Sequence, residues 1–166
     1  MSVATIVLLA ATCVAAAVDV RTRRIPNALT AATALLALAV HVPDGIVAVL
    51  IAFATMILAF LAGSLAFSAG WFGGGDVKLI AACCGLIGGF AALSLVLDIL
   101  VAGAVLALVT AAFRGRLGAL VRSTVAIAAH GVPVEKSTLP YAVAIAAGSV
   151  VYALAPLVPV LRFPAS

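Results

Sequence analysis

Charged residues are scarce in this chain of 166 residues: they make up 8% of it, whereas hydrophobic residues make up 67%. A soluble domain contains about 25% charged and about 45–50% apolar residues. A core built by a chain of this length cannot hide so much apolar surface from water, which excludes a soluble globular protein. We therefore expect an integral membrane protein in contact with the lipid bilayer, forming a single domain over residues 1–166.

Cysteine and histidine are also rare. Cys13, Cys83 and Cys84 lie in apolar runs without a CxxC pair or a Cys/His cluster, so we expect neither a zinc site nor a disulfide framework. His41 and His130 fall near opposite membrane faces, which argues against a serine or cysteine protease. The glycine motifs that bind phosphates are incomplete. We therefore expect no metal, no cofactor and no nucleic-acid partner.

The period-two alternation of lipid-facing β-strands is missing, and alanine, leucine and valine dominate the composition. Helices of about 17–25 apolar residues can cross a bilayer. We expect an all-α polytopic membrane bundle of about six transmembrane helices, with the glycine-rich stretch Ala69–Asp76 as a loop. The predicted segments are Val3–Val18, Ala28–Val42, Ile46–Ser68, Val77–Phe90, Ala91–Phe113 and Pro140–Leu161.

Basic residues predict the orientation, because they collect on the cytoplasmic side of membranes. With the N-terminus outside and six crossings, every Lys and Arg except Arg162 falls inside. No basic residue precedes the first apolar run, so we expect a retained helix and not a cleaved signal peptide. Leu117–His130 is expected to form an interfacial helix on the inner leaflet, with a seventh crossing as the alternative.

Two aspartates stand out, because a carboxylate at the edge of an apolar segment is costly unless it has a partner or a use. Asp19 ends the first predicted helix, and Asp76 follows the triple glycine 73–75. The predicted topology places both at the cytoplasmic face, where we expect them to meet. Two such carboxyl groups share a proton, so that one activates water as a base while the other protonates a scissile carbonyl.

Other roles for these aspartates remain open from the residues alone. Asp19 would pair with Arg23, and Asp76 would cap the fourth helix. Intramembrane acids also serve transport, so a small proton- or ion-coupled carrier is one alternative to an enzyme. A non-catalytic assembly protein is another, and tolerance of Asp→Asn changes would favour it.

Three blocks resemble motifs of the type IV prepilin peptidases. Gly73–Asp76 fits the GxGD pattern of intramembrane aspartic proteases, and the longer run GGGDVKLIAA is similar to that of prepilin peptidases. The block from Asp19 to Ile25-Pro26-Asn27 and the Pro140-Tyr141 block near the last helix are similar to theirs as well. The blocks occur in the order of that family and span nearly the whole chain.

The resemblance implies an aspartic endopeptidase whose catalytic pair is Asp19 and Asp76. Its substrates would be prepilins, which carry a short basic leader, a glycine at the cut and a hydrophobic helix beyond it. It also implies a multi-pass protein of the bacterial or archaeal inner (cytoplasmic) membrane, with the pilus assembly machinery as a further partner. Larger members have paired cysteines and methylate the new N-terminus. This chain resembles the short Flp-type (tight-adherence, Tad) pilus peptidases, so methylation is not expected.

Residues near the two aspartates are candidates for binding substrate or shaping the site: Gly73, Gly74, Gly75, Lys78, Pro26 and Asn27. The glycines would let a substrate backbone approach the catalytic carboxylate, or they form a plain turn. The lysine would pair with Asp76, steer an acidic group of the substrate or mark the inner interface. The proline starts the second helix, which the asparagine would cap.

Overall fold

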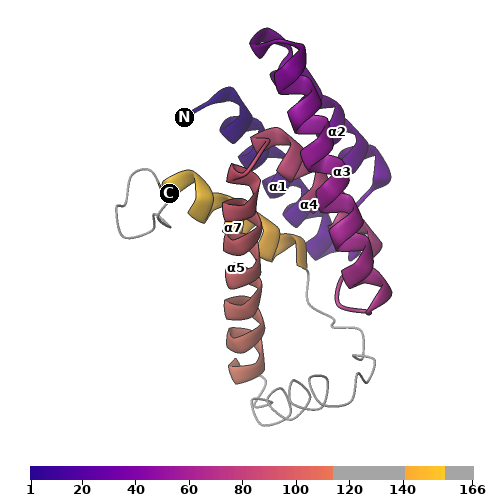
Figure 1. Ribbon diagram of the computed structural model, residues 1–166. Coiled ribbons are helices and arrows are strands. Elements are labelled where there is room, and N and C mark those ends of the chain that lie inside the picture. The colour runs from indigo at the N-terminus through magenta and orange to yellow at the C-terminus, as the bar shows by residue number, and fades with distance from the viewer. Residues whose placement is uncertain (114–140, 156–166) are drawn as a thin grey trace.

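The computed structural model describes residues 1–113 and 141–155. Within these ranges the chain is helical and contains no strand, which confirms the predicted helical membrane bundle. The elements are α1 (Val3–Thr22), α2 (Asn27–Val40), the 3-10 helix η1 (Val42–Asp44), α3 (Ile46–Ser68), α4 (Gly74–Ile87), α5 (Ala91–Phe113) and α7 (Tyr141–Leu154) (Figure 1).

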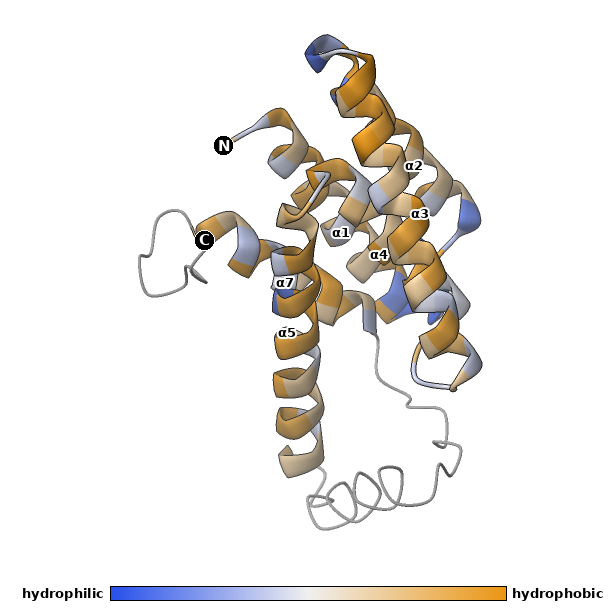
Figure 2. Ribbon diagram, viewed as in Figure 1, coloured by the Kyte–Doolittle hydropathy of each residue, from blue (hydrophilic) through white to orange (hydrophobic). Residues whose placement is uncertain are grey.

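Among the described helices, α1, α3 and α5 are long and apolar enough to cross a membrane. Figure 2 shows mostly hydrophobic ribbon along the helices, with hydrophilic segments mainly at their ends and connections. Large apolar side chains such as Leu61 and Leu65 of α3 point outward. Exposure to water would cost about 25 cal/mol per Å² of this surface, whereas lipid accepts it. The outer surface is therefore suited to a bilayer.

The observed helix bounds differ from the predicted ones mainly beside the two aspartates. The helix α1 continues to Thr22, so Asp19 lies one turn inside it and not at its end. The apolar run ends at Val18, but the helical hydrogen bonds continue beyond it. The N–H of Arg23 still donates to the carbonyl of Asp19 at 2.7 Å. The helix α4 begins at Gly74, which moves Asp76 from the predicted loop into the first helical turn.

Elsewhere the predicted segments and the helices agree more closely. The bounds of α3 and α5 match the prediction, and α2 begins one residue earlier and ends two residues earlier than predicted. Pro43 lies in η1, which connects α2 to α3. Gly88 and Gly89, both with positive φ, turn the chain between α4 and α5. The predicted interfacial helix or seventh crossing at Leu117–His130 lies outside the described residues.

The central helix of the bundle is α4. It packs against α2 and α3 and also contacts α1, α5 and α7. Its Leu79, Cys83 and Leu86 are fully buried and belong to the main apolar core. Gly85 lets the neighbouring helices come close, because a Cβ there would lie 3.2 Å from Cβ of Met56 in α3. The burial of this helix fixes the position of its first turn, which carries Asp76.

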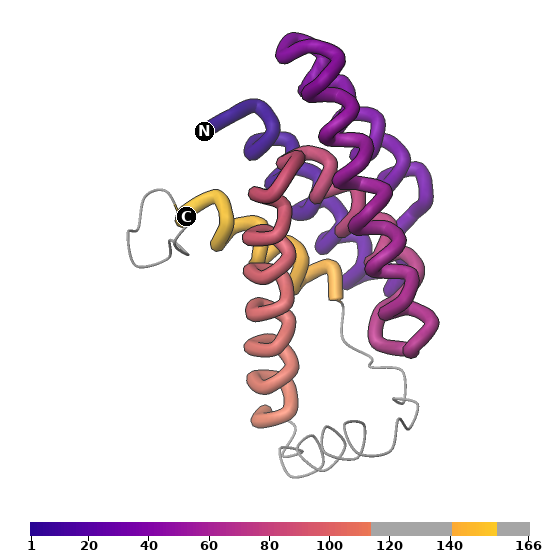
Figure 3. Tube along the Cα trace, in the orientation of Figure 1, coloured from indigo at the N-terminus to yellow at the C-terminus, as the bar shows by residue number. Residues whose placement is uncertain are grey.

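The helix α7 packs against α1 and crosses α5 obliquely (Figure 3). At the crossing, Gly148 lies against the backbone of α5, and a Cβ added there would lie 2.5 Å from Cα of Ile99. No side chain fits between the two helices at this position. Because α7 also contacts α1, the crossing links α5 to the helix that carries Asp19.

We predict that Gly148→Ala destabilises the bundle by about 1–3 kcal/mol, because the added methyl group forces two backbones apart. The measurement is the apparent Tm of the purified protein in detergent. Ala147→Leu is the matched control, since it adds a larger group at an exposed neighbouring position. Equal Tm values for wild type and Gly148→Ala would contradict the close crossing.

Candidate active site

Asp19 is held by the start of another helix. Its side chain is 7% exposed, and its Oδ2 accepts a hydrogen bond from the backbone N–H of Ala142 in the first turn of α7, at 3.3 Å. The first N–H groups of a helix have no partner within the helix, and they carry the positive end of its dipole. The start of α7 therefore stabilises negative charge on Asp19 and offsets the cost of burying it.

Asp76 lies in the first turn of α4, ahead of the buried stretch of that helix. Its Oδ2 accepts a hydrogen bond from the N–H of Gly73 at 3.2 Å. Burial raises the pKa of Asp76 to about 6; the negative charge of Asp19 acts in the same direction, and the hydrogen bond from Gly73 opposes both. The structure thus brings the two carboxyl groups into one site, where the charge on one affects the protonation of the other.

Tyr141 is a third member of the site. It is the first residue of α7, directly before the residue that binds Asp19. Burial, and then the negative charge of Asp76, raise the pKa of Tyr141 to about 12. The ring of Phe72 contacts Tyr141 edge-to-face, with ring centroids 4.9 Å apart. Neither aromatic residue was among the predicted site residues, although the Pro140-Tyr141 motif was a signal for one of them.

The predicted site-shaping residues lie where α2 and α4 begin. A Cβ at Gly75 would lie 3.2 Å from Cβ of Ile25, so glycine lets the first turn of α4 pack against the connection that follows α1. Lys78 donates a hydrogen bond from Nζ to Oδ1 of Asn27 at 2.9 Å, which ties α4 to α2. Pro26 is the N-cap residue of α2, so the prediction that Asn27 caps this helix is wrong.

Four helix ends therefore converge around the two aspartates: the end of α1 and the starts of α2, α4 and α7. In this site the charge of Asp19 acts on the protonation of Asp76, and the charge of Asp76 acts on that of Tyr141. Residues 6–112 match the model of the type IV leader peptidase family. The chain belongs to this family.

Membership of the type IV leader peptidase family makes the protein a protease of the prepilin-leader type, which confirms the resemblance seen in its motifs. The matched residues run from α1 to α5 and include Asp19 and Asp76, but they end before α7. A search of curated proteins and a search of solved structures found no match. The contribution of α7 to the site is therefore known from the geometry alone.

We predict that Gly73→Ala impairs this leader peptidase without unfolding it. The added Cβ would lie 2.7 Å from Oδ2 of Asp76, so the flexible carboxyl group has to move. A small displacement of a reacting group can lower kcat on the order of a hundredfold. Gly74→Ala is the control, because its Cβ meets only the ring of Phe67 at 3.6 Å. Equal kcat values for the two variants, at unchanged Tm, would contradict this account.

We also predict that stability falls as the pH rises. The folded protein binds the Asp76 proton more tightly than the unfolded chain, since the pKa rises from 3.8 to about 6 on folding. The resulting stabilisation is complete below about pH 4 and is lost as the pH rises through about 6. Apparent Tm values in detergent at several pH values measure this loss.

In that titration, Asp76→Asn should flatten the decline of Tm between about pH 4 and 6, because it removes the titrating group. Asp44→Asn changes an exposed aspartate of η1 and should leave the decline in place. A decline that is the same in wild type and in Asp76→Asn would show that Asp76 does not bind its proton more tightly in the folded state.

Proposed function

We propose that this leader peptidase is an aspartic endopeptidase that removes the leader of prepilin-like substrates at the cytoplasmic membrane face, with Asp19 and Asp76 as its catalytic pair. The observation that supports this most is the difference between the two environments. Asp19 accepts a hydrogen bond from the backbone N–H of Ala142 at the start of α7, whereas burial raises the pKa of Asp76 to about 6. Paired carboxyl groups in different environments can divide the roles of base and acid.

In the proposed first step, the Asp19 carboxylate takes a proton from a water molecule, and the water oxygen attacks the carbonyl carbon of the scissile bond. Asp76 gives its proton to the carbonyl oxygen. The diol collapses when the C–N bond breaks: the leaving nitrogen takes the proton held by Asp19, and a diol hydroxyl returns a proton to Asp76. Both groups regain their starting states without a covalent intermediate.

The neighbouring residues have positioning roles in this proposal. The N–H of Gly73 orients Asp76, and Gly75 keeps the first turn of α4 close to the Ile25 connection. Gly74 adjoins both glycines and has only ordinary contacts, and it has no role in the proposed chemistry. Lys78 and Asn27 hold the α2–α4 side of the site together, and Pro26 sets the start of α2.

We further propose a short, non-methylating enzyme of the Flp (Tad) pilus type. The connection between α1 and α2 is only the segment Arg23–Pro26, which leaves no room there for a cytoplasmic domain with paired cysteines. The protein would be a multi-pass component of the inner membrane with the N-terminus outside. It would hand processed subunits to the pilus assembly machinery.

The decisive assay mixes the purified protein in detergent with a precursor from the same genome that has a short basic leader before an apolar segment. Wild type should remove the leader, and mass spectrometry should find an unmethylated new N-terminus even with S-adenosylmethionine present. Asp19→Asn and Asp76→Asn should each lower the rate by about a hundredfold or more, because acid–base catalysis contributes about 10²–10⁴-fold.

Two other aspartates provide controls for this assay. Asp44→Asn and Asp98→Asn change acids of η1 and α5 that the proposal leaves out of the chemistry, and both variants should cleave the precursor. Cleavage that survives either Asp19→Asn or Asp76→Asn in a folded protein would refute the two-aspartate mechanism. A folded wild type that cleaves no such precursor would favour a carrier or an assembly role.

A further inference from the structure

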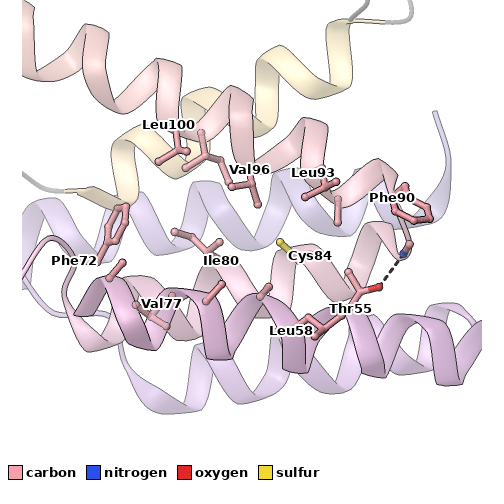
Figure 4. A pocket seen from close by; sticks show the side chains of 17 residues that line it. Thr55, Leu58, Phe72, Val77, Ile80, Cys84, Phe90, Leu93, Val96 and Leu100 are labelled. Carbon is pink, nitrogen blue, oxygen red and sulfur yellow. Dashed lines mark hydrogen bonds between the residues drawn. The ribbon is translucent and has the colours of Figure 1, made fainter. Parts of the chain in front are cut away.

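A long apolar cavity of about 670 Å³ lies between α3 and α5, with α4 as its floor (Figure 4). Leu58 of α3 lies on one side, Leu93 and Val96 of α5 lie on the other, and Ile80 and Cys84 of α4 lie between them. We call this cavity the α3–α5 groove. It is open along part of its length and is lined almost entirely by apolar side chains.

One end of the groove adjoins the candidate active site. Phe72 lines this end, and its ring contacts Tyr141 of the candidate site. Val77, the residue after Asp76, also lines the groove. A substrate peptide that extends from the two aspartates in this direction therefore enters the apolar groove directly, and Phe72 lies at the entrance.

The other end of the groove reaches the turn between α4 and α5. Phe90 lines it, and the N–H of Gly89 donates a hydrogen bond to Oγ1 of Thr55 at 2.9 Å (Figure 4). The groove thus follows nearly the whole length of α4, whose 14 residues correspond to about 21 Å.

Beyond Leu58, the α3 wall of the groove is made of small residues. Ala59, Ala62 and Ala66 line it at spacings of three and four residues, which places them on one face of the helix. Small side chains on such a face let another helix approach closely, and close packing is what drives association in lipid. A peptide in an apolar environment must also satisfy its own backbone hydrogen bonds, so the occupant has to be helical.

We propose that the α3–α5 groove binds an apolar helix of the substrate that begins next to the scissile bond. This inference rests on the proposed function and deepens it, because it names the part of the substrate that the protein holds during cleavage. Val77 and Phe72 would contact the first turn of that helix, and the alanine face of α3 would contact the turns that follow. The competing occupant is lipid.

A second cavity between α2 and α3 fits this substrate less well. It is smaller, about 360 Å³, and its polar end carries Lys78 and Asn27. These two side chains already bind each other, and the cavity does not include Phe72. The groove is therefore the only one of the two that is continuous with the aromatic entrance beside Asp76.

Photo-crosslinking tests the occupant directly. A benzophenone amino acid would replace either Leu58 (67% exposed) or Leu93 (61%), which line the groove, in an Asp76→Asn background that does not consume the precursor. Leu61 (56%) and Leu97 (47%) are matched controls one turn along the same helices, and they do not line it. We expect crosslinks to the apolar segment of the precursor from the first pair, several-fold above the controls.

A second variant tests the groove through catalysis. Ala62→Phe fills the groove from an exposed position, and Ala54→Phe adds the same ring to an exposed position of α3 outside it. We expect Ala62→Phe to raise KM for the whole precursor roughly tenfold with little change in kcat, because it removes binding shared by the ground and transition states. Ala54→Phe should leave KM unchanged.

The two experiments separate failure of the groove from failure of the proposed function. If wild type cleaves the precursor, any one of three results would overturn the groove proposal. These are equal crosslinking at all four positions, crosslinks only to lipid, and an unchanged KM in Ala62→Phe. Crosslinks confined to Leu58 and Leu93, found with a wild type that cleaves nothing, would support the groove and refute the peptidase mechanism.

Discussion

The hydrogen bond between the N–H of Ala142 and the carboxylate of Asp19 is the constraint on which the site depends. It joins two residues that are 123 positions apart in the chain and fixes the start of α7 against the end of α1. A buried carboxylate without this partner would be costly, and a helix start without an acceptor would leave its N–H groups unpaired. This one hydrogen bond gives the carboxylate a donor and the helix start an acceptor. It also fixes the position of the neighbouring Tyr141, whose pKa the charge of Asp76 helps to raise.

The helix α4 links this polar site to the apolar body of the bundle. Its first turn carries Asp76, its middle is buried between α2 and α3, and one of its faces forms the floor of the α3–α5 groove. The two features differ in character, since the site is formed by charged side chains and the groove is lined almost entirely by apolar ones. Phe72 lies where they meet and contributes to both.

Much of this arrangement could be predicted from the sequence, and the failures have physical reasons. Long apolar runs predicted the bounds of α3 and α5 correctly, although the border between α4 and α5 was poorly marked in the sequence. The hydropathy pattern placed the end of α1 too early and the start of α4 too late. Helical hydrogen bonding continues through the polar residues after Val18 and already includes the glycines before Asp76. The part played by Ala142 could not be predicted, because a backbone N–H has no signature in the sequence.

The central claim is that Asp19 lies close enough to Asp76 for its negative charge to raise the pKa of Asp76. The most direct test is a ¹³C NMR titration of labelled aspartate carboxyl groups in the detergent-solubilised protein, in wild type and in Asp19→Asn. We predict that Asp76 titrates near pH 6 in wild type and at a clearly lower pH in Asp19→Asn, while burial keeps the midpoint above 3.8. An Asp76 midpoint that Asp19→Asn leaves unchanged would contradict the claim.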